Sequence, residues 1–339
     1  MTKKNLSLPF LILAVSSAWA AHAAEKQFIY ETAPYPSCHA STIVETATPG
    51  EFLASWFGGS DEGKPDVAIW QSRWTGGKWS VPEEIAREEK IATYNPVYFF
   101  TPDKLLWMYY RFGPSPMTWT SARKFSKDQG ATWSAADYLP AGLLGPIKNK
   151  PLVLKNGTIL AGSSVESYKS WNCWVERSTD NGKSWTKHGP ISVPGELYGI
   201  IQPAIVQLSS SKKLRMYVRA TSKIGKICVS GSTDDGKTWS AARPLADLPN
   251  PNSGLDAVGL RDGRVILVYN HTPKGRSPLN VAVSKDGEKF NKFLDLETEP
   301  GEFSYPAVIQ ASNGDVHITY TWNRKKIRHV VVKLSEIPQ

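Results

Sequence analysis

Two side chains with acid–base or nucleophilic chemistry stand at the start of short runs rich in β-branched and aromatic residues. Tyr305 lies between Ser304 and Pro306, and its hydroxyl could act as a nucleophile or an acid. His39 holds a comparable place near the start of the chain, and its ordinary pKa suits a general base or acid. A purely structural histidine and a packing tyrosine are the competing interpretations. The candidate catalytic set is completed by three carboxylates: Glu302, Asp256 and Glu62.

Arginines follow the same kind of run at four places. They are Arg111, Arg219, Arg276 and Arg324. Guanidinium binds a carboxylate through two parallel hydrogen bonds, so the set predicts a clamp for an acidic ligand, although any one of them could be a surface ion pair. The other candidate substrate-binding residues are Lys150, Asn95, Gln202, Asn252, Glu166 and His271. His, Cys, Asp and Glu show no tight metal-ligand spacing, so we expect no metal and no cofactor.

A recurring octet sets the spacing of these residues. Its best copies are Ser126–Trp133, Ser178–Trp185 and Ser232–Trp239; Ser284–Phe290 is a worn copy, and Ser72–Trp79 has lost the Asp. The closing aromatics, at 79, 133, 185, 239 and 290, are 51 to 54 residues apart, which indicates a repeat architecture. Asp at the third position and Gly at the fifth suit a tight turn, so we interpret the octets as structural.

A strand–turn–strand pattern recurs six times, and the first five copies are followed by an octet. The turns centre on Pro49-Gly50, Asp103-Lys104, Asn156-Gly157, Ser210-Ser211, Asp262-Gly263 and Asn313-Gly314. This predicts an all-β fold, a six-bladed β-propeller with four-stranded antiparallel blades. The last unit has room for only three strands, so we expect Gln27–Tyr30 to supply the fourth. Hairpin turns and octets would then share one face, and the candidate site residues would gather on the other.

The first residues have the pattern of a secretory signal peptide. Lys3 and Lys4 precede the apolar run Leu6–Ala20, and small residues follow, so we expect a signal peptide over 1–23 and a propeller domain over 24–339. The protein would be periplasmic or secreted, monomeric, and without membrane insertion. Its net charge would fall from +9 to +7, because the peptide carries two lysines. Without a basic run or motif we expect no nucleic acid, and an acidic glycan or oligosaccharide is the expected partner.

The octets resemble the Asp-box (BNR) repeats of the six-bladed sialidase-like superfamily. The resemblance covers nearly the whole mature chain, and stretches such as Gly145–Pro151 and Gly301–Pro306 resemble a sialidase-like branch within it. Exo-sialidases use an arginine triad, a tyrosine nucleophile activated by Glu, and an Asp acid/base. The resemblance implies that Tyr305 matches the nucleophile and that Arg219 and Arg276 are triad members. His39 stands in place of the first Arg, and Gln202 in place of the activating Glu.

Three functions fit these residues. The first is a secreted glycoside hydrolase that removes a terminal sialic or uronic acid, with Tyr305 and a nearby carboxylate as the catalytic pair. The second is a polysaccharide lyase in which His39 or Tyr305 removes the proton beside a uronate carboxylate. The third is a propeller that binds glycans without turnover. An unsaturated product that absorbs in the ultraviolet separates lyase from hydrolase.

Overall fold

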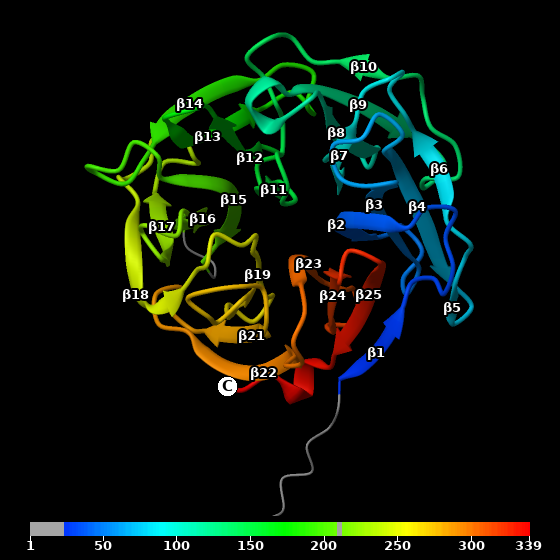
Figure 1. Ribbon diagram of the computed structural model, residues 1–339. Coiled ribbons are helices and arrows are strands. Elements are labelled where there is room, and N and C mark those ends of the chain that lie inside the picture. The colour runs from blue at the N-terminus through cyan, green and yellow to red at the C-terminus, as the bar shows by residue number, and fades with distance from the viewer. Residues whose placement is uncertain (1–23, 209–211) are drawn as a thin grey trace, which may run out of the picture.

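The structure is a closed ring of six antiparallel sheets around a central axis, as Figure 1 shows face-on. The computed structural model describes residues 24–208 and 212–339. The predicted fold class, a six-bladed β-propeller with four-stranded blades, is confirmed. The predicted signal peptide and the predicted turn at Ser210-Ser211 lie outside the described residues. No helix within the described ranges is long and apolar enough to cross a bilayer.

The blades follow one another in chain order, each beginning with its innermost strand. Blade 1 holds β2 (Ser37–Glu45), β3 (Phe52–Gly59), β4 (Ala68–Thr75), β5 (Lys78–Trp79) and β6 (Glu83–Ala86), the last two both pairing with β4. Blade 2 holds β7 (Thr93–Phe100), β8 (Leu106–Phe112), β9 (Thr120–Ser126) and β10 (Asp137–Tyr138). Blade 3 holds β11 (Leu152–Val153), β12 (Ile159–Glu166), β13 (Trp171–Ser178) and β14 (Thr186–Ile191).

The second half of the ring repeats this order. Blade 4 holds β15 (Ile200–Gln207), β16 (Leu214–Ala220), β17 (Lys226–Ser232) and β18 (Arg243–Pro249). Blade 5 holds β19 (Asp256–Gly259), β20 (Val265–Tyr269), β21 (Leu279–Ser284) and β22 (Asn291–Glu297). Blade 6 holds β23 (Phe303–Gln310), β24 (Val316–Trp322), β25 (Lys326–Val332) and β1 (Glu25–Phe28). Two short 3-10 helices, η1 (Pro116–Thr118) and η2 (Leu334–Glu336), complete the described elements.

The ring is closed by the N-terminal strand, as the sequence predicted. β1 pairs antiparallel with β25, and in Figure 1 the blue first strand lies beside the red last blade. The strand is two residues earlier than expected. The Ile29 amide still donates to the Ile327 carbonyl at 2.9 Å, but the side chains of Ile29 and Tyr30 lie in the core between blades 6 and 1. There the Tyr30 ring stacks on Trp56, with 5.1 Å between the ring centroids. The first and last blades are thus joined by backbone pairing and by aromatic packing.

The octets form the tight turns that their sequence indicates. In the octet of blade 4, Asp234 accepts hydrogen bonds from Ser232 Oγ, the Thr238 amide and Thr238 Oγ1. Gly236 has a φ of +77°, and a Cβ there would approach a side-chain carbon of Leu160 in blade 3 to 2.8 Å. Glycine is therefore required both by the turn and by the neighbouring blade.

Hairpin turns and octet turns share one face of the ring, as predicted. Hairpin turns and octet turns contact one another between neighbouring blades: the Ala47 amide donates to Gln129 Oε1 in blade 2, and Asn156 Nδ2 donates to Asp235 Oδ2 in blade 4. We call this the octet face. The opposite face, which we call the site face, carries the starts of the inner strands and the connections between second and third strands. Its polar loops are held by the apolar cores within and between the blades.

Candidate active site

Four inner strands share a backbone irregularity where they begin. In each the pairing register shifts, after His39, Tyr94, Ile201 and Ser304 respectively. Within these shifts Ala40, Asn95, Gln202 and Tyr305 adopt φ values between +41° and +57°, a region that non-glycine residues rarely occupy. Such a backbone costs about 1–3 kcal/mol per residue and is typical of functional sites, where a bulge re-aims a side chain.

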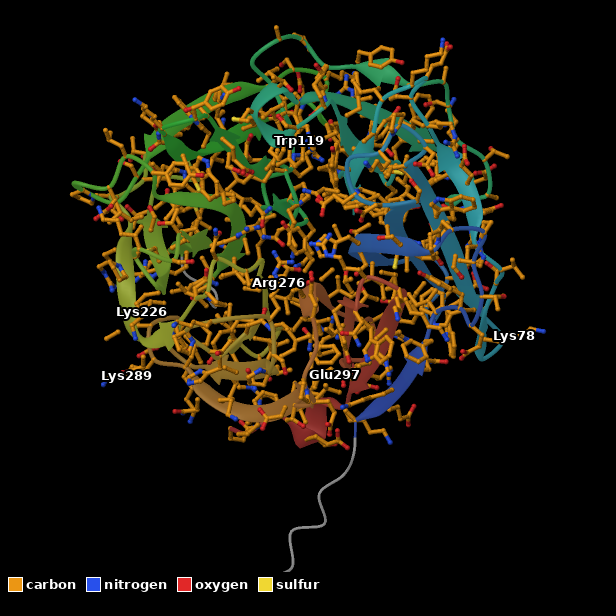
Figure 2. All side chains as sticks on the ribbon, viewed as in Figure 1. Lys78, Trp119, Lys226, Arg276, Lys289 and Glu297 are labelled. Carbon is orange, nitrogen blue, oxygen red and sulfur yellow. The ribbon has the colours of Figure 1, made fainter. Side chains whose placement is uncertain are left out.

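Tyr305 of blade 6 is aimed at the ring axis. Its ring lies 4.1 Å from that of His39 in blade 1, measured between centroids, and Figure 2 shows Arg276 of blade 5 near the middle of the ring. Its hydroxyl oxygen accepts a 2.7 Å hydrogen bond from Arg219 Nη1 and a 3.2 Å bond from Gln202 Nε2, both in blade 4. Contacts with three other blades are possible only for a group on the axis.

Three arginines gather around Tyr305 and the carboxylate of Glu302. The guanidinium carbons of Arg219 and Arg276 lie 5.8 and 5.5 Å from the Tyr305 ring centroid. Arg276 Nη1 and Arg324 Nε reach Glu302 Oε1 at 2.6 and 2.9 Å, and Arg324 Nη1 also pairs with Glu62. Each arginine keeps an Nη2 group with no hydrogen-bond partner among the described residues. The cluster therefore retains donors for an acidic ligand.

Glu302 and Glu62 neutralise part of this charge. Partial burial of Glu302 would raise its pKa, but the charges of Arg276 and Arg324 and their hydrogen bonds hold that pKa below the ordinary value. Glu302 is consequently ionised near neutral pH. It orients two arginines and is poorly suited to donate a proton.

His39 is fully buried beside Tyr305. Its Nδ1 lies 3.0 Å from Thr321 Oγ1, whereas its Nε2 has no partner within the described chain. Burial, followed by the charges of the surrounding arginines and of Lys148, lowers the pKa of His39 well below its usual value. The imidazole is therefore neutral near pH 7 and can accept a proton.

Lys148 lies beside Tyr305, although the sequence analysis had named Lys150 as the substrate-binding lysine. Its ammonium donates to Asn149 Oδ1 at 2.8 Å, to the Leu255 carbonyl at 2.9 Å, and to the carbonyl of Pro306. The nitrogen is 5.8 Å from the Tyr305 ring centroid, and burial lowers the pKa of Lys148 to about 7. Two lysines spaced two apart look alike in sequence, so only the backbone path could separate them.

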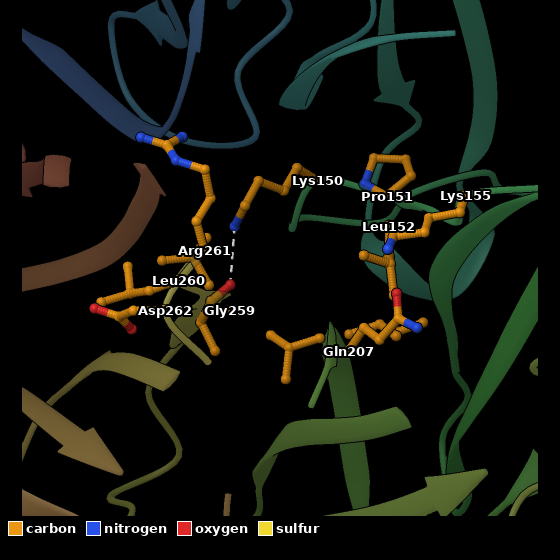
Figure 3. A pocket seen from close by; sticks show the side chains of 13 residues that line it. Lys150, Pro151, Leu152, Lys155, Gln207, Gly259, Leu260, Arg261 and Asp262 are labelled. Atoms are coloured by element: carbon orange, nitrogen blue, oxygen red, sulfur yellow. Dashed lines mark hydrogen bonds between the residues drawn. The ribbon is translucent and has the colours of Figure 1, made fainter. Parts of the chain in front are cut away.

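Lys150 and Asp256 lie toward the other end of the axis. Lys150 Nζ donates to Asp256 Oδ2 and to the Ala257 carbonyl, both at 2.9 Å. Lys150 lines a pocket of the octet face together with Lys155 and Arg261, as Figure 3 shows. Asp256 is buried in this ion pair and also accepts the Val308 amide. The structure therefore separates Asp256 and Lys150 from Tyr305.

Arg111 and His271 also stand apart from the cluster. Arg111 is fully buried and donates to the backbone carbonyls of Leu144, Asn95 and Pro146, so its guanidinium supports the loop after blade 2. His271 Nδ1 contacts Tyr269 Oη at 2.5 Å, and its amide donates to Asn280. These contacts hold the histidine against its own blade.

The remaining predicted ligands border the site. Asn95 Nδ2 donates to the Ile147 carbonyl, and Asn252 Oδ1 accepts from Arg219 Nε at 2.7 Å. Glu166 ends β12, two residues after Ser164, whose Oγ accepts from the Gln202 amide. Since alternate residues share a strand face, Glu166 lies on the side of β12 that faces Gln202. In the described part of the chain, no three His, Cys, Asp or Glu side chains are grouped to hold a metal ion.

Comparison with known families settles the lineage. The model of the BNR repeat-like domain matches residues 50–318. The chain belongs to this family. The predicted resemblance to sialidase-like propellers with BNR repeats is thereby confirmed. No curated protein matches the chain.

Solved structures share this BNR-repeat fold at low sequence identity. A protein of unknown function from Dyadobacter fermentans has 18% identity and a TM-score of 0.74, with 91% of this chain and 97% of that one covered. The NanB sialidase from Streptococcus pneumoniae has 14% identity and a TM-score of 0.76, with 92% and 71% covered. The intramolecular trans-sialidase from Ruminococcus gnavus has 12% identity and a TM-score of 0.74, with 93% and 98% covered. The likeness lies in the fold.

Proposed function

We propose that this BNR-repeat protein is a sialidase-like glycoside hydrolase that removes a terminal acidic sugar, of the sialic or uronic acid type, from a glycan. The observation that carries the proposal is the surrounding of Tyr305. Its hydroxyl oxygen accepts hydrogen bonds from two N–H donors, and the guanidinium groups of Arg219 and Arg276 lie over its ring. Arg324 joins Arg276 on the neighbouring carboxylate of Glu302. A nucleophile beside a carboxylate clamp is the arrangement that an acidic exo-glycosidase requires.

In the proposed reaction the sugar carboxylate binds the spare Nη2 groups of Arg219, Arg276 and Arg324. Tyr305 Oη then forms a bond to the anomeric carbon while the bond from that carbon to the leaving oxygen breaks. Water cleaves the glycosyl–tyrosine bond in a second step, with overall retention of configuration. Gln202 cannot take the tyrosine proton, so we assign that proton to His39, a neutral base beside the ring. The neighbouring positive charges stabilise the developing phenolate.

The leaving oxygen needs a proton donor, and we assign this role to Glu166. Glu302, Glu62 and Asp256 are all engaged in ion pairs with arginine or lysine. The carboxyl group of Glu166 makes no hydrogen bond or ion pair with any described residue, and burial raises its pKa against the opposing charge of Arg219. A raised pKa keeps a carboxyl group protonated closer to neutral pH, as a general acid requires.

The proposal is tested by product analysis on matched substrates. Sialylated and glucuronate-capped oligosaccharides are compared with analogues whose terminal carboxylate has been reduced to an alcohol. We expect release of the free acidic sugar, and a loss of kcat/KM of about a hundredfold or more on reduction, because desolvated guanidinium groups lose their ionic partner. If none of the acidic substrates releases its terminal sugar, the proposal is contradicted.

A second candidate function is that of a lyase that acts by β-elimination at a uronate. The environment of His39 is the one observation that favours it. Its buried Nε2 has no partner within the described residues, and its lowered pKa keeps it neutral, as a base that removes the proton beside a carboxylate must be. The same assay separates the two chemistries, since elimination leaves an unsaturated sugar that absorbs in the ultraviolet and hydrolysis does not.

A further inference from the structure

Exposed apolar side chains concentrate on the site face over blades 3 and 4. Of the eight large hydrophobic residues that are exposed in the described structure, four belong to the end of β12 and two neighbouring connections: Val165, Tyr168, Leu197 and Tyr198. Tyr168 is 84% exposed and Leu197 is 76% exposed. Scattered single residues of this kind need no explanation, but a cluster on the face of a candidate active site indicates a binding surface.

These connections border a groove of about 570 Å³. Tyr198 and Leu197 form its apolar side, and the Tyr198 ring is backed by Trp171, with 4.4 Å between the ring centroids. Polar groups complete the lining: Lys169, Glu196, Thr221, Ser222, Lys223 and Asn252. One aromatic face opposite several hydroxyl, amide and charged groups matches the two sides of a sugar ring.

The walls of the groove are held by backbone contacts among three connections. The Trp171 amide donates to the Leu197 carbonyl at 2.9 Å, and the Thr221 amide donates to Gly199 at 3.0 Å. Thr221 Oγ1 also donates to the Tyr198 carbonyl at 3.2 Å. Tyr198 is therefore fixed in place before a ligand arrives, which lowers the entropic cost of binding.

The groove is connected to the candidate nucleophile through Asn252. Its Oδ1 accepts from Arg219 Nε at 2.7 Å, and Arg219 Nη1 in turn donates to Tyr305 Oη at 2.7 Å. Asn252 Nδ2 has no partner among the described residues and can donate to a sugar hydroxyl at the inner end of the groove. A glycan whose terminal sugar lies at Tyr305 thus has its next sugar directed toward Tyr198.

We propose that this groove binds the neutral sugar to which the terminal acidic sugar is attached, with one face of that sugar on Tyr198 and its hydroxyls toward Asn252 and Ser222. The assignment rests on the proposed hydrolase function. It adds a leaving-group site, and with it a preference for oligosaccharides over simple glycosides.

The test compares two substrates that share the same terminal sugar. One is an acid-capped lactose, such as 3′-sialyllactose or its glucuronate-capped counterpart, and the other is the methyl glycoside of that acid. Tyr198→Ala should lower kcat/KM on the capped lactose about tenfold, the scale of a lost aromatic contact, and leave the methyl glycoside unchanged. Tyr138→Ala is the matched control, because Tyr138 is 55% exposed on the outer strand β10 of blade 2. Leu197→Ser repeats the test if Tyr198→Ala does not fold.

The possible outcomes distinguish a failure of the groove proposal from a failure of the hydrolase proposal. Equal rates for wild type and the folded groove variant on the capped lactose would overturn the groove, while the activity itself would stand. If wild-type protein cleaves neither substrate, the hydrolase proposal fails, and lactose binding measured by isothermal titration calorimetry then tests the groove. Binding that is lost in Tyr198→Ala would support a sugar site, and no lactose binding to wild type would overturn it.

Discussion

In the proposed reaction, Tyr305 is activated by positive charge. The resemblance to exo-sialidases implies an activating Glu at the position of Gln202, which here donates to the tyrosine oxygen and cannot take its proton. Arg219, Arg276 and Lys148 supply positive charge within 6 Å of the ring centroid. Preorganised charges of this kind stabilise an anion in a water-poor site more strongly than in solution. The account therefore depends on electrostatic stabilisation of the tyrosine oxygen.

Glu166 gives a prediction at the scale of a single residue. The general acid must be protonated, so wild-type kcat/KM should fall as pH rises through the raised pKa of Glu166. Glu166→Gln should lower turnover by roughly a hundredfold and abolish that alkaline limb. A raised carboxyl pKa means that the ionised form destabilises the fold at higher pH, so the Tm of Glu166→Gln at pH 7 should equal or exceed that of wild type. An unchanged pH profile in the variant would assign the acid elsewhere.

At the scale of elements, the octet turns are separate from the chemistry. Asp128, Asp180 and Asp234 each hold the same three hydrogen bonds, and those bonds lower the pKa of each carboxyl to about 2. All three lie on the octet face, across the ring from Tyr305. We therefore expect them to contribute to stability and not to the chemistry.

Asp234→Ala should reduce stability without reducing activity per folded molecule. The loss of unfolding free energy is expected to be about 1–3 kcal/mol, because the variant removes the acceptor for four donors. Since the folded pKa is depressed, this contribution is full above about pH 4 and disappears as pH falls toward 2. Urea unfolding at pH 7 and at pH 2.5 measures both effects. Asp247→Ala, an exposed carboxylate on β18, is the control and should change neither value.

The sequence could predict the blades because their signals are local. An Asp–Gly turn and an alternating strand are each recognisable from neighbouring residues. The same patterns recur about every fifty residues, so each copy supports the others. The candidate site could not be predicted from local patterns, since the residues that contact one another there come from different blades. Arg111 and Arg219 look alike in sequence, yet one is satisfied by backbone carbonyls and the other by Tyr305. Lys148 was likewise indistinguishable from Lys150 until the backbone path was known.

At the scale of the whole molecule, the axial site depends on a closed ring. β1 supplies the fourth strand of blade 6, and Ile29 and Tyr30 fill the boundary with blade 1. His39 and Tyr305, which face each other across that boundary, belong to blades 1 and 6. Opening the ring would therefore separate His39 from Tyr305.

A chain that begins at residue 31 should show this dependence when compared with one that begins at residue 24. Loss of the β1 ladder and of the buried Ile29 and Tyr30 side chains should lower the Tm by about 10 °C or more. Differential scanning calorimetry measures it directly. Equal melting temperatures for the two chains would show that β1 does not hold the ring together.

The central claim is that Tyr305 is the nucleophile of an acidic-sugar hydrolase, and Tyr305→Phe tests it most directly. The change removes only the hydroxyl, so the Tm should stay close to that of wild type, with Tyr138→Phe as the control for loss of a surface hydroxyl. Turnover of an acidic glycan that the wild-type protein cleaves should fall by roughly a hundredfold or more. Wild-type turnover in Tyr305→Phe would contradict the account and transfer the catalytic role to His39.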